Sequence, residues 1–293
     1  MIIVRLSGGL GNQMFQYAAG YALSVYHNVS LFLDVNDFSE HKWHNGFGLE
    51  RIFSCPVKRA DRKNVHTLLG WQSWKPIRNR IALPSWRFLR NRRLIVEPGF
   101  HYWPGIFNVT NPCYLIGYWQ SERYFATVEK AIRAIFTFRQ PLSHHNQEIS
   151  YKISEVNAVS LHVRRGDYAG NPQIFIKHGL CPASYYEKAV EYIRQRVPEP
   201  HFFVFSDDMD WVKKNLRIAG SVYYVDCNRG PESYNDMRLM SMCRHHIIAN
   251  STFSWWGAWL NPVKTKIVVA PKRWFHDCST DTRDLFPEGW ITL

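Results

Sequence analysis

The sequence predicts an α/β protein built on parallel β-sheets and divided into two domains. Short apolar segments alternate with longer helical segments near the N-terminus and again throughout the second half. Such alternation is typical of β-α-β units, whose strands pair in parallel. A chain of 293 residues is also long for a single core. We therefore expect domains at residues 1–150 and 151–293, with the default functional site in a cleft at their junction.

The alternation of strand and helix is clear at the start of the first half and is then lost. The apolar run IIVRL predicts a strand at 2–6, GGLGNQ a turn at 8–13, and the following residues a helix at 14–26 and a strand at 29–34. Between residues 35 and 150 the periodicity is poor, and Pro and Trp are frequent. The clearest elements of that stretch are a strand near 114–118 and a helix near 123–135.

The second half keeps a regular alternation to its end. Apolar runs predict strands at 158–163, 201–206, 221–225, 245–250 and 266–270. Helical patterns separate them at 183–197, 208–217, 233–243 and from about Ser254 onward. Strands of this length joined by single helices indicate one parallel sheet.

Composition indicates an ordered protein, since hydrophobic residues make up 46% of the chain. No segment approaches the roughly 18 uninterrupted apolar residues of a membrane span. The N-terminus, MIIVRLSGG, lacks the basic and apolar regions of a signal peptide. We therefore expect a cytoplasmic protein. Its six scattered cysteines are then expected to be reduced thiols rather than disulfides or a zinc site.

Positive charge is concentrated in residues 58–93. This segment holds eleven basic residues and one acidic residue, Asp61, with Trp and Leu side chains between them. The mixture suits an anionic and apolar surface, such as the inner face of a bilayer or a lipid-linked acceptor. Nucleic acid is the rival partner, because Arg and aromatic residues also bind phosphates and bases. A third interpretation is a solvated basic face whose tryptophans belong to the core.

Three polar loops follow predicted strands of the second half. They are RRGDY after strand 158–163, SDDMD at 206–210 and NSTFSWWG at 250–257. The carboxyl ends of parallel strands share one edge of a sheet, and ligands bind at that edge. These loops therefore predict a binding site.

The adjacent arginines of the first loop need not share a function. Alternation along the strand places Arg164 on the side of His162 and Arg165 on the opposite side. Neighbouring cations are costly to bury unless an anion lies beside them. Arg164 is thus the candidate for an anionic ligand, whereas Arg165 is expected to brace the loop or pair with a carboxylate.

The third loop places hydroxyl groups at a predicted helix start. Helix N-termini with Ser and Thr oxygens bind anions well, so a diphosphate between this helix start and Arg164 is the favoured interpretation. The alternative is that Ser251, Thr252 or Ser254 only caps the helix.

The aspartates of the second loop also have two interpretations. Paired carboxylates could hold a divalent cation on a nucleotide diphosphate. The favoured interpretation has Asp207 lining the nucleotide and Asp208 or Asp210 capping the next helix, because a metal would make Arg164 and the hydroxyl loop redundant. We expect no metal site.

Four segments carry a resemblance to a known family. They are RLSGGLGNQMFQYAAGYAL at the start, LHVRRGDY in the middle, FSDDMDWVKKNL, and DMRLMSMCRHHIIANSTFSWWGAWLN towards the end. They are similar to the α-1,2-fucosyltransferases of glycosyltransferase family 11, in the expected order, from residue 1 to about residue 275. The resemblance implies a GT-B fold, with two Rossmann-like domains whose parallel sheets face each other across a cleft.

The same resemblance implies an activity. GDP-fucose would bind mainly to the C-terminal domain, and L-fucose would pass with inversion to the 2-hydroxyl of a galactose-terminated oligosaccharide, as in O-antigen-type synthesis. The resemblance implies a reaction that is independent of metal, in which GDP-fucose is a donor substrate rather than a cofactor. No nucleic acid partner is implied, and whether the acceptor is lipid-linked stays open.

The resemblance also implies donor-site roles. Arg164 would hold the β-phosphate of GDP, since a departing diphosphate needs fixed positive charge and N–H donors. Asp236 matches the position that binds guanine, with an N-terminal dipole partner as its alternative role. His162 would lie along the nucleotide, or be a buried structural histidine. The expected donor-site residues are His162, Arg164, Arg165, Asp207, Asp236, Ser251, Thr252, Phe253 and Ser254.

Proton transfer and acceptor binding are assigned to other loops. Asp167 is the candidate general base because it is the carboxylate closest to the phosphate loop. Gly-Asp is also ordinary turn chemistry, and a departing phosphate or a water could take the proton instead. The amides of Asn12 and Gln13 suit hydroxyls of fucose or acceptor. Gly8, Gly9 and Gly11 do not form a dinucleotide fingerprint.

A second class of function stays open beside this one. The chain could be a non-catalytic carbohydrate- or nucleic-acid-binding protein that uses the segment 58–93. The set of polar loops at predicted strand ends argues for the transferase.

Overall fold

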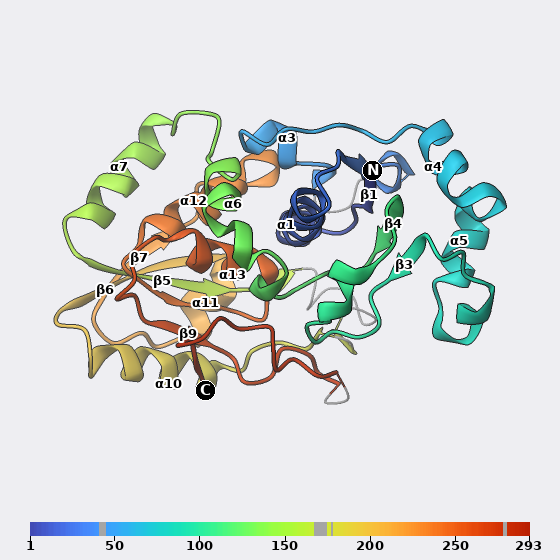
Figure 1. Cartoon of the computed structure of the whole chain (residues 1–293). Coiled ribbons are helices and arrows are strands. Elements are labelled where there is room, and N and C mark those ends of the chain that lie inside the picture. The colour runs from blue at the N-terminus through green and yellow to red at the C-terminus, as the bar shows by residue number, and fades with distance from the viewer. Residues whose placement is uncertain (41–44, 167–174, 177, 278–279) are drawn as a thin grey trace. The chain divides into compact units, whose positions relative to one another are not determined.

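The computed structural model describes residues 1–40, 45–166, 175–176, 178–277 and 280–293. The chain forms two compact α/β units, Met1–Arg139 with Asp281–Pro287, and Gln140–Thr280 with Glu288–Leu293 (Figure 1). The division follows Arg139, whereas the sequence analysis placed it after residue 150. Helix α7 (His144–Ser154) accounts for the difference, because it packs on β5 and α12 of the second unit.

The first unit contains a parallel sheet with the strand order β2-β1-β4-β3. Its strands are β1 (Ile2–Arg5), β2 (Leu31–Asp34), β3 (Leu94–Val96) and β4 (Cys113–Ile116). The described helices of this unit are α1 (Leu10–Tyr26), α2 (Asp37–Glu40), α3 (Leu49–Ile52), α4 (Arg62–Leu69), α5 (Lys75–Ile81) and α6 (Glu129–Ile135). Short 3-10 turns form η2 (Gly70–Ser73), η3 (Pro84–Leu89), η4 (Pro104–Asn108), η5 (Glu122–Tyr124) and η6 (Ala126–Val128).

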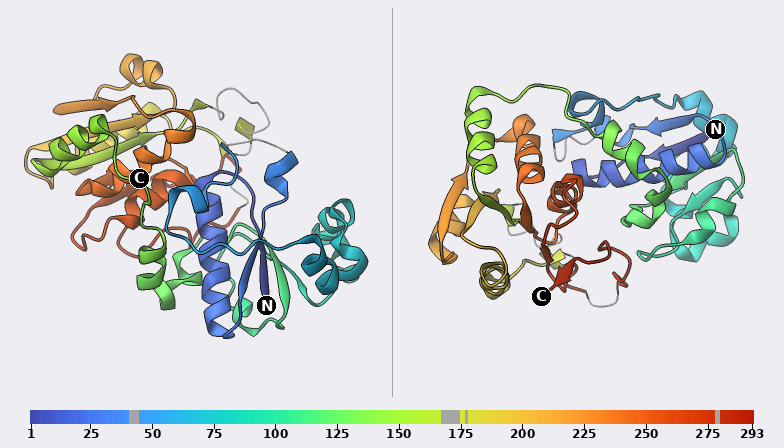
Figure 2. Two further views of the ribbon diagram at one scale, coloured as in Figure 1. Left: turned by 90° about the horizontal axis from the view of Figure 1, so that it is seen from above. Right: turned by 60° about the vertical axis from the view of Figure 1, so that its left-hand side comes forward.

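Helices cover both faces of this first sheet. α1 lies beside the strands (Figure 2, left) so closely that a Cβ atom at Gly20 would stand 2.3 Å from Cγ2 of Val4, so only glycine fits there. The neighbouring Ile3 points to the other face, where α4 and α5 pack. Their apolar cluster there contains Ile3, Leu94 and Tyr114 of the sheet with Val65, Leu68, Leu69 and Ile81 of the helices.

Three elements of the first unit differ from the sequence-based expectation. Helix α1 begins at Leu10 rather than at residue 14, so the predicted turn at 8–13 is mostly helical. The helix expected near 123–135 is interrupted, with η5 and η6 preceding α6. Strand β3 was not expected, since it has three residues in a stretch without periodicity.

The segment 58–93 folds as α4, η2, α5 and η3, and its side chains separate into two groups. Leu68, Leu69 and Ile81 are buried, whereas Trp71 and Trp74 are 59% and 64% exposed. The interpretation of these tryptophans as core residues is therefore wrong. We define the basic aromatic face by the large apolar and basic residues of 71–93 that are exposed, which are Trp71, Trp74, Leu83, Phe88, Leu89, Arg80, Arg87, Arg92 and Arg93.

One arginine of the segment belongs to the core. Arg78 is buried, and its Nη2 lies 3.3 Å from Oδ2 of Asp34 at the end of β2. The hydroxyl of Tyr114 donates to the same carboxylate, and the guanidinium lies 4.8 Å from the centroid of the Tyr114 ring. A buried charge is tolerated only when it is paired in this way, so Arg78 stabilises the first unit and is not available to a partner.

The second unit contains one parallel sheet, as its alternating pattern predicts, and the strand order is β10-β9-β8-β5-β6-β7. The two-residue strand β10 was not expected. Its strands are β5 (Asn157–Val163), β6 (Pro200–Ser206), β7 (Ser221–Val225), β8 (His245–Ile247), β9 (Val268–Ala270) and β10 (Ile291–Thr292). Its described helices, besides α7, are α10 (Ala183–Arg194), α11 (Met209–Asn215), α12 (Tyr234–Met242) and α13 (Thr252–Leu260), with a turn η7 (Gly230–Glu232).

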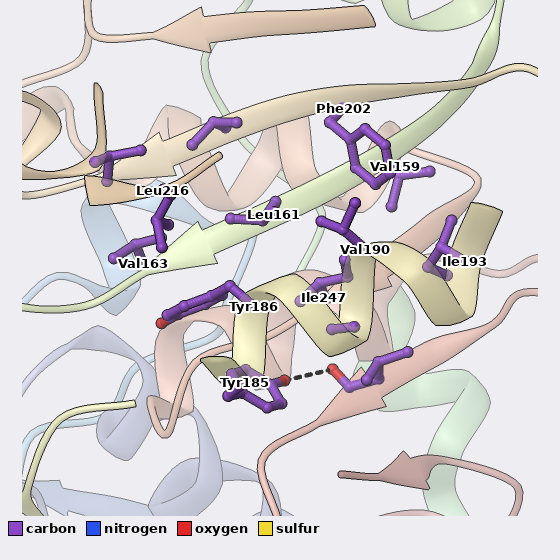
Figure 3. Close-up of a cluster of buried hydrophobic side chains, with 14 of the residues drawn as sticks. Val159, Leu161, Val163, Tyr185, Tyr186, Val190, Ile193, Phe202, Leu216 and Ile247 are labelled. Carbon is purple, nitrogen blue, oxygen red and sulfur yellow. Dashed lines mark hydrogen bonds between the residues drawn. The ribbon is translucent and has the colours of Figure 1, made fainter. Parts of the chain in front are cut away.

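The two faces of this sheet differ in chemistry. On one face Leu161 and Val163 pack with Tyr186 and Val190 of α10 in a mainly apolar cluster (Figure 3). On the other face Ser160 contacts Nδ1 of buried His246 at 2.8 Å, and Nδ2 of Asn261 contacts its Nε2 at 2.8 Å. Burial holds the pKa of His246 well below its usual range, so this histidine is a neutral structural residue.

Two further expectations concern cysteines and membrane spans. The five cysteines that lie in the described residues are free thiols, and Cys278 lies outside them. Among the described helices, none is both long and apolar enough to cross a bilayer.

Candidate active site

The carboxyl ends of β5 and β6 bring Arg164 and Asp207 together. Nη1 of Arg164 lies 3.0 Å from Oδ2 of Asp207, and the backbone N–H of Arg165 donates to Oδ1 of the same carboxylate at 2.8 Å. The register pairs Val163 with Ser206, so the residues one step beyond each strand meet at the sheet edge. The side chains of Arg164 and Asp207 are 24% and 27% exposed, which leaves the pair accessible from solvent.

Arg165 makes the contacts of a brace. Its Nε lies 3.3 Å from Oδ2 of Asp208, and its guanidinium stacks 3.8 Å from the centroid of the Trp211 ring. Asp208 in turn caps α11, because its carboxylate accepts the backbone N–H of Trp211 at 3.2 Å. The carboxylate partner predicted for Arg165 and the cap at Asp208 are therefore seen in the structure, whereas the anionic ligand expected at Arg164 stays a prediction.

His162 lies beneath the Arg164 loop and beside α13. Its ring centroid is 5.8 Å from that of Phe253. The side chain is buried, and among the described residues no hydrogen-bond partner reaches its Nδ1 atom. Burial lowers the pKa of His162 to about 4, while Asp207 opposes and Arg164 adds to that shift. The unsatisfied nitrogen of this neutral imidazole is itself buried, so a contact with the nucleotide and a structural role both stay open for His162.

The start of α13 brings hydroxyl groups to the same edge. Ser251 is the N-cap, and its Oγ accepts the backbone N–H of Phe253 at 3.3 Å. Ser254 is fully buried and its hydroxyl donates to the carbonyl of Ser251 at 3.2 Å. The capping interpretation thus holds for Ser251, while anion binding by this helix start, including Thr252, stays a prediction.

Asp236 lies in the first turn of α12 but does not cap it. The N-cap position is Ser233, and the Asp236 carboxylate instead accepts Nδ2 of Asn228 at 2.8 Å. Asn228 is held in turn by paired hydrogen bonds with Asn146 of 2.9 and 3.0 Å. Burial raises the pKa of Asp236 to about 7, and no cation pairs with it among the described residues. A positioned carboxyl without a counter-charge is available for a ligand donor.

The side-chain amides of Asn12 and Gln13, in the first unit, make different kinds of contact. Asn12 Oδ1 accepts Nε2 of Gln120 at 2.9 Å. Gln13 is buried, and its Nε2 donates to the carbonyls of Gly8 and Gly46, both at 3.0 Å. Its Oε1 accepts the N–H of Gly48 at 3.0 Å. Gln13 therefore fixes the chain around Gly46–Gly48, and its expected contact with substrate remains a prediction without support here.

Two predicted features concern the reaction rather than binding. Asp167, the expected base, lies outside the described residues. Where the structure describes the chain, no group of three or more His, Cys, Asp or Glu residues is arranged to hold a metal ion. Asp207 and Asp208 each pair with an arginine instead. The expected independence from metal stays a prediction.

The structure adds residues that the sequence analysis did not single out. Asn146 and Asn228 position Asp236, but isolated asparagines carry no sequence signal of such a role. Glu97 directly follows β3, and its carboxylate accepts the backbone N–H groups of Tyr118 and Trp119 at 2.7 and 3.0 Å. In the second half of the chain, polar residues that directly follow a predicted strand indicated the binding site. The same signal would have applied to Glu97, but the sequence analysis did not predict strand β3.

Solved structures that resemble the chain define its class. The fucosyltransferase NodZ from Bradyrhizobium matches with a TM-score of 0.53 at 16% identity, over 89% of this chain and 92% of that one. A NodZ α-1,6-fucosyltransferase soaked with GDP-fucose matches with a TM-score of 0.52 at 15% identity over the same shares. At these identities the likeness shows the fold. The two parallel-sheet units have the GT-B fold, as the sequence resemblance implied.

Sequence comparison gives the family. The model of "Glycosyl transferase family 11" matches residues 103–293. The "Alpha-1,2-colitosyltransferase" of Escherichia coli is 37% identical over all of this chain and 99% of its own length. The "O-antigen biosynthesis glycosyltransferase WbnK" of Escherichia coli is 34% identical over 98% of this chain and 99% of its own length. The mouse "Galactoside 2-alpha-L-fucosyltransferase Sec1" is 27% identical over all of this chain and 74% of its own length. The chain belongs to glycosyltransferase family 11.

Proposed function

We propose that this glycosyltransferase moves L-fucose from GDP-β-L-fucose to the 2-hydroxyl of a terminal galactoside, forming an α-1,2 linkage with inversion. The observation that carries the proposal is the group of unlike polar side chains at one edge of the second sheet. Arg164, His162 and Asp236 each have a distinct chemical match in a guanine nucleotide. The name of the mouse relative supports fucose as the sugar, and the name of the colitosyltransferase supports the α-1,2 linkage. The name of WbnK supports a part in O-antigen synthesis.

The diphosphate is assigned to Arg164 and the start of α13. The His162–Phe253 contact joins the end of β5 to the first turn of α13, so a group bound above His162 has Arg164 on one side and helix N–H groups on the other. As the bond between sugar and phosphate breaks, negative charge accumulates on the leaving GDP. Fixed cations and aligned N–H donors stabilise that charge without reorganisation.

Guanine is assigned to Asp236. Guanine offers N1–H and N2–H side by side, and a carboxylate can accept both, whereas adenine offers no such pair. The Asn146–Asn228 pair fixes the carboxylate from behind, because Asn228 already donates to Oδ1. This arrangement predicts selection of guanine over adenine nucleotides. The neutral His162 imidazole, with its unsatisfied Nδ1, would hydrogen-bond the same nucleotide.

A second donor has specific support. The relative that is 37% identical over the whole chain is a colitosyltransferase, and colitose is fucose without its 3-hydroxyl group. A GDP-linked colitose would differ from GDP-fucose only in the sugar. The assigned nucleotide contacts would therefore serve either donor. An assay in which the two GDP-sugars compete for the enzyme distinguishes which donor it prefers.

The basic aromatic face supports a place of action. Four exposed arginines surround exposed Trp and Phe side chains, a composition that suits the headgroups of anionic lipids and the apolar layer just beneath them. We propose a cytoplasmic enzyme that contacts the inner membrane face, where a lipid-linked oligosaccharide acceptor would be presented. A role in nucleic acid binding has no support in the family.

The testing experiment is a transfer assay with linkage analysis. Purified protein is incubated with GDP-fucose or GDP-colitose and a panel of β-galactosides, and the product is analysed for anomeric configuration and linkage. Transfer of fucose to the galactose 2-hydroxyl is expected. Preferential use of GDP-colitose would contradict the assignment of GDP-fucose as the donor. Transfer to another hydroxyl would contradict the assignment of an α-1,2 linkage. Binding of the galactosides without any product would favour the non-catalytic alternative.

A further inference from the structure

A carboxylate lies at the carboxyl edge of the first sheet. Glu97 directly follows β3, while Tyr118 and Trp119 come after β4. Because these strands are parallel, their carboxyl ends share one edge, where α/β proteins bind their ligands. This edge belongs to the first unit, which contributes none of the residues assigned to the nucleotide.

The carboxylate of Glu97 is held in a fixed position. Its Oε2 accepts the N–H of Tyr118 at 2.7 Å and its Oε1 accepts the N–H of Trp119 at 3.0 Å. The chain passes so close at Gly117 that a Cβ atom there would lie 2.5 Å from Cβ of Glu97. Trp119 adopts a left-handed φ of 57°, a conformation that is costly for a bulky residue and that clusters at functional sites. Each carboxylate oxygen keeps a second lone pair, so the group can accept two further hydrogen bonds.

The charge of this carboxylate is not compensated. Among the described residues, no Lys, Arg or His pairs with Glu97, and Arg5, which lies near the Tyr118 phenol, is itself paired with Asp37 at 2.7 Å. The titratable groups that face Glu97 are the phenols of Tyr118 and Tyr124. Burial raises the pKa of Glu97 to about 7, although the two backbone hydrogen bonds lower it. A charge kept without a partner costs the folded state free energy, and such groups cluster at functional sites.

The groups beside Glu97 suit a sugar ring. The Glu97 side chain is partly exposed, so a ligand can reach it, and Tyr118 is 40% exposed beside it. At the start of α1 the half-buried amide of Asn12 is oriented by Gln120, which donates to its Oδ1 at 2.9 Å. Ligand sites typically combine aromatic surface with a few fixed polar groups. Here the carboxylate offers acceptors for two neighbouring hydroxyls, and the phenol ring offers a flat surface for the C–H face of a sugar.

Other common ligands match this edge less well. An uncompensated carboxylate repels phosphate groups. A divalent cation would need further oxygen or imidazole ligands, and within the part of the chain that the structure describes no group of three His, Cys, Asp or Glu residues is arranged to supply them. A neutral ligand rich in hydroxyl groups fits both the acceptors and the aromatic surface.

We propose that the carboxyl edge of the first sheet binds a saccharide, and that Glu97 accepts hydrogen bonds from two of its neighbouring hydroxyl groups. Tyr118 packs against the C–H face of the same sugar ring. The assignment rests on the proposed function, which indicates a β-galactoside as the saccharide. The contacts involve the first unit alone, so binding is measurable without a nucleotide donor.

The test is the binding of lactose and N-acetyllactosamine, two β-galactosides, to the full chain in the absence of any GDP-sugar. Their NMR signals are followed during titration of the unmodified protein, Glu97→Gln and Tyr118→Ala. The unmodified protein should bind. Glu97→Gln should lose about tenfold or more in affinity, because hydrogen bonds to a charged group are the stronger ones. Tyr118→Ala should show a smaller loss.

Two control variants match these changes. Glu129→Gln removes a carboxylate of the same unit that pairs with Arg133 on the surface of α6. Tyr26→Ala removes a tyrosine that is 62% exposed at the opposite end of α1. Both controls should bind the galactosides as the unmodified protein does.

The affinity should also depend on pH. Ionised Glu97 accepts two hydroxyl donors, whereas the protonated carboxyl accepts fewer, so galactoside affinity should fall as pH decreases below about 7 and level off above it. Glu97→Gln should flatten this profile, and Glu129→Gln should keep it.

Melting temperatures separate binding from structure. Tyr118→Ala keeps the backbone N–H that bonds Glu97, so its fold should be unaffected. Unchanged galactoside affinity in Glu97→Gln and Tyr118→Ala, or no binding of either galactoside by the unmodified protein, overturns the site. A loss confined to Glu97→Gln and accompanied by a lower melting temperature gives Glu97 a structural role only.

The proposed function is judged separately, by the transfer assay. Galactoside binding that depends on Glu97, without any fucose transfer, supports the site and contradicts the function. Fucose transfer by a chain whose galactoside affinity is unchanged in Glu97→Gln supports the function and overturns the site.

Discussion

Arg164 and Asp207 face each other at 3.0 Å where β5 and β6 end, at the sheet edge to which we assign the donor. Asp207 also accepts the backbone N–H of Arg165, so one carboxylate fixes both the side chain and the following peptide group. The pair offers a phosphate a cation that is already oriented. Because these groups are already fixed in place, less conformational entropy is lost when the ligand binds and reacts.

Arg164→Ala should abolish transfer, and Arg164→Lys should lose most of it, because an ammonium cannot reproduce a bidentate fork on phosphate. Arg165→Lys is the matched control. It keeps the charge near Asp208 and loses only the stacking on Trp211, so it should be milder. The measurements are kcat/KM and GDP affinity. Near-full activity of both Arg164 variants would show that Arg164 does not bind the phosphate of the donor.

Asp236→Asn should weaken GDP binding and reduce the preference for GDP over ADP, since Asn presents one acceptor and a misplaced donor to guanine. Asp210→Asn, an exposed aspartate in the first turn of α11, is the control. Calorimetric affinity is compared with melting temperature. A lower melting temperature with unchanged GDP affinity would give Asp236 a structural role only.

The same carboxyl predicts how GDP affinity depends on pH. The pKa of Asp236 is raised to about 7 in the free protein, so below that pH the group must lose a proton before it can accept two donors. GDP affinity should therefore fall as pH decreases below about 7, by up to about tenfold per pH unit, and level off above it. Asp236→Asn should flatten this profile. A wild-type affinity independent of pH would argue against guanine at Asp236.

Transfer should persist in EDTA, because Arg164 and the α13 start supply the charge stabilisation that a divalent cation would otherwise give. Asp207→Asn should lower activity by disturbing Arg164, without creating or removing a metal requirement. Activity that is lost in EDTA and restored by manganese or magnesium would assign the SDD run to metal binding.

The basic aromatic face should control membrane binding without affecting catalysis. Reversal of Arg80, Arg87, Arg92 and Arg93 to Glu should lower binding to anionic vesicles, since each cation near such a surface contributes on the order of 1 kcal/mol. Transfer to a small soluble galactoside should stay near normal. Arg78 and Arg90 are excluded from this set: Arg78 is paired with buried Asp34, and Arg90 donates to the carbonyls of Ile81 and Ala82.

The control for this experiment is reversal of four exposed cations of the second unit, Lys188, Arg194, Lys213 and Lys214, which changes net charge equally. Binding of the unmodified protein should also weaken as salt rises. If the unmodified protein ignores anionic vesicles at low salt, the face is simply solvated.

The parts predicted from sequence are those that depend on local pattern. Alternation along β5 separated Arg164 from Arg165, and the position of Asp208 before a helix predicted its cap. What was missed depends on distant partners. Arg78 looks like any cation of a basic run, because its carboxylate partner, Asp34, lies 44 residues earlier. Glu97 follows a strand of three residues, which is too short to leave a period in the sequence.

Gln13 shows how an error in one boundary changes a role. With the helix expected from residue 14, Gln13 would lie in a loop and its amide would face a ligand. Because α1 begins at Leu10, the side chain is on the first turn and bonds the backbone at Gly46 and Gly48. A helix start of Gly-Gly-Leu-Gly has no side-chain N-cap to mark it, so the sequence offers no signal for the correct boundary.

Calorimetric titration of GDP into the unmodified protein in the presence of EDTA tests the central claim most directly. The account predicts saturable binding at one site per chain, tighter for GDP than for ADP, and lost in Arg164→Ala. Absence of GDP binding, or equal binding of ADP with Arg164→Ala unaffected, would contradict a GDP-sugar site at the carboxyl edge of the second sheet.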